Sequence, residues 1–272
     1  MKKELAIAKK AAAVGASILR QNYEKKFKIR KKSAINLVTE VDEKAQSAIV
    51  KIIRQAFPED AILAEEGDLS KTKAAPRRWI IDPLDGTTNF AHGYPRFCVS
   101  IAFEEKGQVR VGVIHDPSMN EVFTAQKSKG AFVNGRRLKV TKKKALRDCL
   151  LVTGFPYDLQ KDSTNNLPYF CHLLFHARAV RRDGSAALNL AYVAAGRFDA
   201  FWELGVKPWD VAAGLLLIRE AGGMVLPIEG EPRDAENPAH LIAGHKENVR
   251  SVFRELQRAH DPKASAGWRK LL

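Results

Sequence analysis

The chain has 272 residues, of which 45% are hydrophobic, so it can form a sizeable core as one large domain or two closely packed halves. No apolar run approaches the roughly 18 residues that span a membrane, and the composition is not that of a disordered chain. The 45 Lys and Arg residues outnumber the 31 Asp and Glu residues, and a field of this sign attracts phosphorylated substrates and polyanions. Three widely spaced cysteines, Cys98, Cys149 and Cys171, form no CxxC pair, which favours reduced thiols in a cytoplasmic protein.

The first predicted element is an amphipathic helix over 3–23. Met1-Lys2-Lys3 ahead of an alanine-rich stretch imitates a signal peptide, but Glu4, Lys9 and Lys10 interrupt the apolar run. One helical face instead collects the apolar residues Leu5, Ala8, Ala12, Gly15 and Leu19. We therefore expect a helix here rather than a cleaved leader.

The rest of the first half combines one more helix with a run of strands. Apolar residues at helical spacing predict a helix over 40–56, which Pro58 ends. Short apolar or alternating runs predict strands over 61–64, 78–81, 97–104, 109–116 and 121–126. Asn134-Gly135 is typical of a tight hairpin.

The second half alternates strands and helices. Strands are predicted over 149–153, 198–203 and 241–243. Helices are predicted over 163–176, 185–195, 209–221 and 246–259. The fold class is thus α+β without a clean boundary, with an N-terminal α+β half over 1–148, a C-terminal α/β half over 149–260 and a basic tail over 261–272.

The most informative segment is Asp82-Pro83-Leu84-Asp85-Gly86-Thr87-Thr88-Asn89-Phe90, directly after the predicted strand 78–81. Pro83 fixes φ and favours a turn that directs Asp82, the Leu84 carbonyl and Asp85 into one space. Carboxylate and carbonyl oxygens are hard donors that suit Mg²⁺ or Mn²⁺ better than zinc.

The same segment offers donors for an anion. Gly86 lets the backbone approach a ligand closely, and N–H groups at Gly86 and Thr87 would face a phosphate if a helix or turn begins there. The Thr87 hydroxyl can orient a water molecule. A DxxDG pattern alone is also typical of a solvated acidic turn, so the interpretation depends on the whole nine-residue string.

That string resembles the first signature of the inositol monophosphatase family, which belongs to a superfamily of lithium-sensitive, metal-dependent phosphatases that includes the fructose-1,6-bisphosphatases. The similarity runs from about residue 4 to 255. It implies a layered α/β/α/β/α sandwich, as in those enzymes, with 1–272 forming a single domain. It also implies two or three Mg²⁺ ions, which Mn²⁺ can replace, lithium sensitivity and a homodimer.

Three further acidic positions match the family in the expected order. Glu65, in Glu65-Glu66-Gly67, matches a metal-bridging glutamate, and Asp42 matches an acidic residue near a third metal and the attacking water. Asp210, in Pro208-Trp209-Asp210-Val211-Ala212-Ala213-Gly214, resembles the second signature, which implies a metal ligand and a contact to a substrate hydroxyl. From the residues alone, the alternatives are a surface carboxylate for Glu65, an exposed helix carboxylate for Asp42 and a helix cap for Asp210, the last of which is compatible with metal binding.

The stretch 181–203 and the string Gly154-Phe155-Pro156-Tyr157 resemble the prokaryotic members of the family. Substrate contacts are implied at Gly184, Ser185, Ala186 and Glu203. Three positions depart from the residues common in the family without removing a ligand: Ala64 for Gly, Gln46 for an acidic residue and Asn189 for Asp.

The resemblance implies catalysis by a metal-activated water. The implied ligands are Glu65, Asp82 and the Leu84 carbonyl for one ion, Asp82, Asp85 and Asp210 for a second, and Glu65 with waters for a third. Thr87 orients the water with Glu65 and Asp42 in support, and phosphate binds the N–H groups of Gly86 and Thr87. Asp85 and Asp210 also contact the substrate. The sequence has no GxSxG or HExxH motif, which argues against a serine hydrolase or a zinc hydrolase.

Inositol monophosphate is the favoured substrate, because Glu203 suits a neutral polyol hydroxyl better than a second phosphate. Fructose-1,6-bisphosphate, adenosine 3′,5′-bisphosphate, histidinol phosphate and NADP(H) remain alternatives, since a metal cage grips only the shared phosphate. A different class of function is regulatory binding of RNA or the transcription machinery through the basic surface. Basic residues cluster at 25–32, 142–147 and 269–270, although no named nucleic-acid motif accompanies them.

Overall fold

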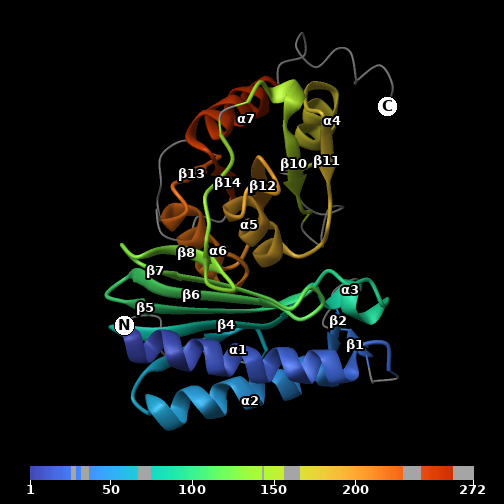
Figure 1. The fold of residues 1–272 in the computed structure, drawn as a ribbon. Coiled ribbons are helices and arrows are strands. Elements are labelled where there is room, and N and C mark those ends of the chain that lie inside the picture. The colour runs from blue at the N-terminus through green and yellow to red at the C-terminus, as the bar shows by residue number, and fades with distance from the viewer. Residues whose placement is uncertain are drawn as a thin grey trace.

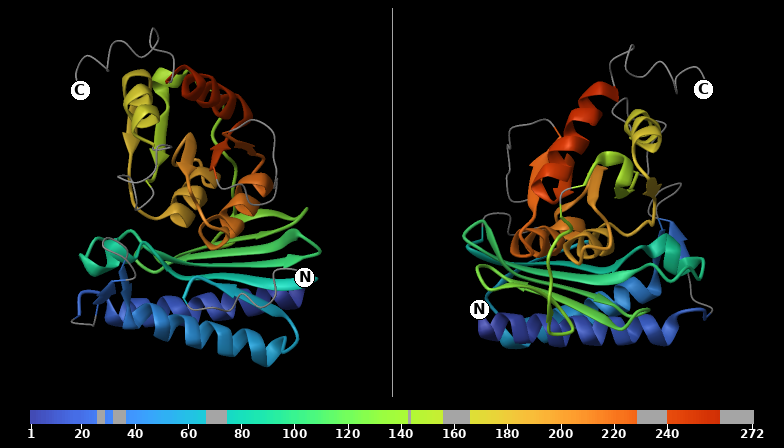
Figure 2. Two further views of the ribbon diagram at one scale, coloured as in Figure 1. Left: turned by 180° about the vertical axis from the view of Figure 1, so that it is seen from behind. Right: turned by 45° about the horizontal axis from the view of Figure 1, so that its top comes forward.

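The computed structural model describes residues 1–25, 29–31, 37–66, 75–142, 144–155, 166–228 and 240–259, with backbone alone for 29–31, 37 and 38. The expected basic tail 261–272, Gly67, Pro156 and Tyr157 lie outside these residues. Helices and sheets alternate in five layers, which Figures 1 and 2 show from three directions. Among the described residues, no helix combines the length and the apolar character needed to cross a bilayer.

The first layer is a pair of helices, α1 (Lys2–Asn22) and α2 (Glu40–Ala56), side by side on one face of the larger sheet (Figure 1). The helices approach closely because α1 buries mainly alanines, and a Cβ on Gly15 would lie 2.8 Å from Ile49 Cδ1. Two short antiparallel strands, β1 (Ile29–Lys31) and β2 (Leu37–Thr39), connect them. The amphipathic N-terminal helix is confirmed.

The second layer is a seven-stranded sheet whose strands follow one another in chain order. Its strands are β3 (Ala61–Ala64), β4 (Arg77–Asp85), β5 (Cys98–Glu105), β6 (Gln108–Asp116), β7 (Glu121–Gln126), β8 (Gly130–Val133) and β9 (Arg136–Arg137). Strands β3 and β4 are parallel and the later neighbours are antiparallel. The Asn134-Gly135 hairpin is confirmed, with both residues at positive φ.

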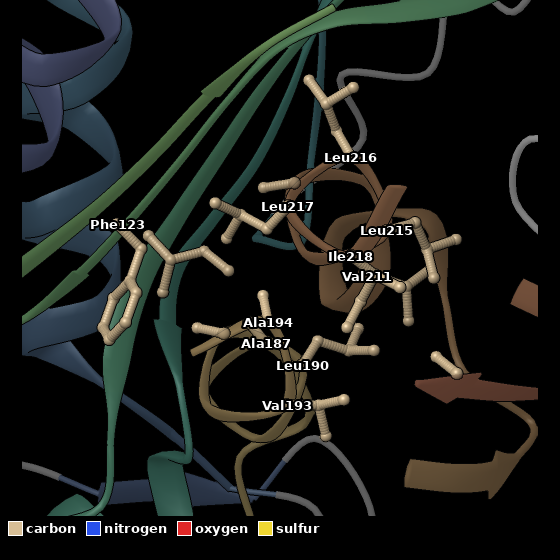
Figure 3. Packing of buried hydrophobic residues seen from close by; sticks show 14 of the residues in the cluster. Phe123, Ala187, Leu190, Val193, Ala194, Val211, Leu215, Leu216, Leu217 and Ile218 are labelled. Carbon is tan, nitrogen blue, oxygen red and sulfur yellow. The ribbon is translucent and has the colours of Figure 1, made fainter. Parts of the chain in front are cut away.

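The third layer consists of α5 (Ala186–Ala194) and α6 (Pro208–Glu220), which lie between the two sheets. Figure 3 shows Leu190 of α5 and Leu217 of α6 in the apolar cluster that also contains Phe123 of the larger sheet. Helix α6 lies very close to this sheet, because a Cβ on Gly112 of β6 would be 2.8 Å from the Ala213 carbonyl oxygen. This shared core joins the two halves of the chain.

The last two layers belong to the second half. Five strands form the smaller sheet in the order β11-β10-β12-β14-β13. They are β10 (Leu150–Thr153), β11 (Ala179–Arg181), β12 (Ala200–Leu204), β13 (Met224–Pro227) and β14 (His240–Gly244). Helices α4 (Leu167–His176) and α7 (Lys246–Ala259) cover its outer face. A short 3₁₀ turn at Leu146–Asp148 precedes β10 in the chain. The α+β class and the layer order agree with the expectation, whereas β11 and β13 were not predicted.

Candidate functional site

A cavity of about 290 Å³ lies where the larger sheet meets the N-terminal ends of α5 and α6. Its lining comes from residues 65–89 of the first half and 154–210 of the second. The acidic side chains that line it are Glu65, Asp82, Asp85, Glu203 and Asp210. All the predicted site residues except Asp42 line this cavity, so both halves of the chain contribute to it.

The Asp82–Asp85 segment is a bulge rather than the predicted turn. Strand β4 continues through Asp85, and its register against β5 shifts between Asp82 and Asp85. The Leu84 N–H donates to Asp82 Oδ1 over 2.9 Å, and Pro83 sits in the bulge, where the sheet requires no donor. The bulge presents both carboxylates and Leu84 to the cavity.

Gly86 and Thr87 follow at the start of the short helix α3 (Thr87–Ala91). Gly86 has a φ of 95°, and a Cβ there would lie 2.6 Å from the Arg96 carbonyl oxygen, so only glycine fits. Thr87 Oγ1 lies 3.2 Å from Asp42 Oδ1 and 3.0 Å from the Leu84 carbonyl oxygen. The hydroxyl has one hydrogen and donates it to one of these two acceptors.

Asp42 is fully buried, so the exposed-carboxylate interpretation of this residue is wrong. It lies in the first turn of α2, where the Thr39 N–H donates to Asp42 Oδ2 over 2.9 Å and the Thr39 hydroxyl bonds the same oxygen. Burial raises the pKa of Asp42, as does the charge of Glu65, while the Thr39 bonds oppose the shift. One carboxylate oxygen caps the helix, and the other faces Thr87.

Glu65 directly follows β3 and lines the cavity; its N–H donates to the Ile81 carbonyl of β4 over 3.1 Å. The neighbouring Glu66 backbone is held by Gln46 of α2, whose amide donates to the Glu66 carbonyl and accepts from its N–H over 3.0 Å. An ionised carboxylate could not make both bonds, because it has no hydrogen to donate. Gln46, noted only as a departure from the family, thus positions the Glu65 loop.

Asp85 is attached to the N-terminus of α5. Its Oδ2 accepts from Ser185 Oγ over 2.6 Å and from the Ala187 N–H over 2.7 Å, and Ser185 also caps the helix. Burial raises the pKa of Asp85 to about 6, and the charge of Glu65 adds to the rise, while these two hydrogen bonds lower it. The predicted substrate residues Gly184, Ser185 and Ala186 all line the cavity, and the Ser185 hydroxyl is directed at Asp85.

Asp210 and Glu203 lie on the wall from the second half. Asp210 is the third residue of α6, and its carboxylate accepts from the N–H of Lys207, the N-cap residue, over 2.7 Å. Asp210 therefore supports the start of the helix without being the N-cap itself. Burial and the charge of Asp85 raise the pKa of Asp210 to about 8. Glu203 of β12 has its pKa raised by burial and then by Asp210, and it fits because Gly154 has no Cβ to overlap its carboxylate.

Asn89 connects the two parts of the site and was not singled out from the sequence. Its Nδ2 donates to the Arg96 carbonyl over 2.6 Å and to the Asp183 carbonyl over 2.7 Å. The second bond ties the end of the Asp82–Phe90 string to the loop before Gly184. Its place within that string was the available signal, but its partner lies 94 residues away.

The electrostatics of the cavity favour bound cations. Five acidic side chains line it, whereas Arg182 is the one basic side chain among the described lining residues. The carboxylates raise one another's pKa values, with Asp82 affected by burial first and then by Glu65, Asp85 and Asp210. Clustered hard oxygen donors of this kind match the ligand preferences of Mg²⁺, so the residues fit the metal ions that the sequence implied.

Three comparisons place the chain among known proteins. A relative from Pseudomonas aeruginosa named Nus factor SuhB is 43% identical over 263 residues, 94% of this chain and 97% of that protein. An inositol-1-monophosphatase from Synechocystis is 45% identical over 82% of this chain and 76% of that protein. A solved inositol monophosphatase structure from Anabaena superimposes with a TM-score of 0.84 at 40% identity, covering 94% of this chain and 96% of that one. The sequence model of the inositol monophosphatase family matches residues 1–261, and the chain therefore belongs to this family.

Proposed function

We propose that this protein hydrolyses phosphate monoesters in a Mg²⁺-dependent reaction and that inositol monophosphate is its substrate. The observation that carries the proposal is the excess of carboxylates over basic groups in the cavity. A phosphate monoester carries about −1.5 to −2 charges at neutral pH, so this surface would repel it without cations. The same surface with divalent cations would attract it.

The oxygen ligands divide into groups as the family resemblance implies. Glu65, Asp82 and the Leu84 carbonyl would hold one Mg²⁺ ion, and Asp82, Asp85 and Asp210 would hold another. Glu65 would share a third, weaker ion with waters. Bound Mg²⁺ supplies charge neutralisation of the phosphate oxygens and acidifies a coordinated water.

Thr87 and Asp42 would handle the proton of the attacking water. While Thr87 Oγ1 donates its hydrogen to Asp42 Oδ1, its lone pairs can accept a hydrogen bond from water. Because Thr39 holds the Asp42 carboxylate, the position of this acceptor beside Thr87 is set before the substrate arrives. Glu65, which lines the same cavity, would also support the water.

Phosphate and the organic group of the substrate would occupy different parts of the cavity. The N–H groups of Gly86 and Thr87 would bind phosphate oxygens, and the 184–186 loop with Glu203 and Asp210 would face the polyol. Glu203 accepts hydrogen bonds from hydroxyls but repels a second phosphate, which favours monophosphates over fructose-1,6-bisphosphate or adenosine 3′,5′-bisphosphate. The Synechocystis relative named inositol-1-monophosphatase supports this choice.

The test is phosphate release by the purified protein from inositol 1-phosphate, fructose-1,6-bisphosphate and adenosine 3′,5′-bisphosphate, with and without Mg²⁺. Asp85→Asn should abolish most turnover, because it removes an oxygen ligand from the cavity. Asp148→Asn is the matched control, since Asp148 is an exposed carboxylate paired with Arg178 far from the cavity. Near-normal turnover by Asp85→Asn would exclude the proposed ligand set. Faster turnover of a bisphosphate than of inositol 1-phosphate would exclude inositol monophosphate as the preferred substrate.

A second candidate function is binding of RNA or the transcription machinery. The relative named Nus factor SuhB and the net charge of +14 both favour it. Retention of the protein on RNA should then fall steeply as salt rises, since phosphate contacts release counterions. If Asp85→Asn is retained on RNA as well as the unaltered chain, RNA binding does not depend on the phosphatase site. If the unaltered chain is not retained even at low salt, the RNA-binding function is excluded.

A further inference from the structure

A second group of metal-binding side chains lies at the outer surface of the smaller sheet. His172 and His176 are one turn apart on α4 and therefore share a face of this helix, and Glu255 reaches them from α7. Each residue offers one ligand atom, and the three atoms lie within 4.8 Å of one another. Figures 1 and 2 show α4 and α7 packed beside each other in the outermost layer.

The hydrogen bonds prepare His176 for a metal ion. Its Nδ1 lies 2.8 Å from the His172 carbonyl oxygen, which can only accept, so Nδ1 carries the hydrogen and Nε2 keeps a lone pair. A backbone carbonyl that orients one ring nitrogen in this way is the usual support for a metal-bound histidine. The side chain is exposed, so an ion can reach it from solvent.

His172 is only 1% exposed, and its Nε2 lies 2.9 Å from Glu255 Oε2. Its Nδ1 is buried without a hydrogen-bond partner among the described residues. Protein groups alone therefore do not satisfy the ring in either tautomer. The other Glu255 oxygen accepts from Arg258 Nη1 over 3.0 Å, which fixes the carboxylate while Oε2 faces the histidine.

We propose that His172, His176 and Glu255 form a binding site for Zn²⁺ or a similar divalent transition-metal ion. Two imidazole nitrogens and one carboxylate oxygen suit such ions, whereas Mg²⁺ prefers oxygen ligands alone. The site is separate from the carboxylate cavity, since it shares no residue with it. A bound ion would tie α4 to α7 and so stabilise the outer layer of the smaller sheet.

The experiment measures Zn²⁺ binding to the full chain by equilibrium dialysis in excess Mg²⁺, which competes with Zn²⁺ for the oxygen ligands of the carboxylate cavity. His176→Ala should weaken the binding by about tenfold or more, because it removes one of three ligands. Glu255→Gln should act in the same direction while retaining a similar side-chain size. Phe175→Ala is the matched control, since Phe175 is the 60% exposed neighbour on α4 and carries no ligand atom.

Location is tested by X-ray absorption at the zinc edge, which should report two imidazole ligands in the unaltered chain and fewer in His176→Ala. Zn²⁺ should also raise the melting temperature of Phe175→Ala but not of His176→Ala, with circular dichroism confirming that both chains fold. Equal Zn²⁺ affinity in all the chains, or an absorption spectrum with oxygen ligands alone, would overturn the proposal. Neither result depends on phosphatase activity, so it leaves the proposed function untouched.

Discussion

Replacing Asn89 by alanine should weaken substrate binding more than it weakens turnover. The amide donates to the carbonyls of Arg96 and Asp183, and the substitution leaves both without this donor. Each lost bond costs about 1 kcal/mol net, so the free energy of unfolding should fall by about 2 kcal/mol. Of these two bonds, only the one to Asp183 holds the 181–186 loop in place for the substrate. Its loss, about 1 kcal/mol, corresponds to about a fivefold rise in KM.

The assay combines urea unfolding with phosphate-release kinetics on inositol 1-phosphate. Asn89→Asp should lower the stability and raise KM more than Asn89→Ala, because it directs a carboxylate at two carbonyl oxygens. Asn22→Ala is the control for the substitution itself, since its amide also donates to a backbone carbonyl over 2.7 Å but within α1, away from the cavity. A normal KM in Asn89→Ala together with the expected loss of stability would refute the link between Asn89 and the 181–186 loop.

Three further outcomes follow from the same structure. Thr87→Val should lower kcat by about 100-fold or more and Thr87→Ser by much less, as single-turnover kinetics can check, because only serine retains the hydroxyl beside Asp42. Gly112→Ala should destabilise the fold by about 1–3 kcal/mol in urea unfolding, since its Cβ would push the Ala213 backbone of α6 away from β6; an unchanged midpoint would contradict this contact. Burial lowers the pKa of His115 from 6.5 to about 4, with Arg20 adding to the shift, so the unfolded chain takes up a proton first as the pH falls. The stability this residue contributes is complete above about pH 6.5 and declines toward pH 4, by about 2 kcal/mol at pH 5. His115→Gln should therefore lose less stability than the unaltered chain between pH 7.5 and pH 5. Equal losses in the two chains would show that His115 is not the source of the pH dependence.

Much of the site could be predicted because its chemistry is local in the sequence. The string from Asp82 to Phe90 carries its own carboxylates, the glycine at positive φ and the start of α3. Helices such as α2 and α7 were also predictable, since one face of each is buried and the other is exposed. The grouping of Asp42 and Asp210 with this string came from the family resemblance, and the structure places them around or behind the same cavity.

Other features depend on pairings that no local pattern encodes. The bulge at Asp82–Asp85 exists only relative to the register of β5, so the residues alone suggested a turn. Strands β11 and β13 are short edge strands without clean alternation of buried and exposed residues. The Gln46 and Asn89 contacts join segments 20 and 94 residues apart, and their partners are backbone atoms, which carry no residue-specific signal.

The way the cavity is assembled also bears on how the chain folds and how long it stays folded. Asp42 contacts a residue 45 positions later, and Asp85 contacts one 100 positions later. Contacts at such separation are slow to form, so the cavity is complete only after both sheets have packed against α5 and α6. Cations bound there would stabilise the native state but not its partly folded precursors. Mg²⁺ should therefore slow unfolding more than it speeds folding, and so extend the lifetime of the native protein.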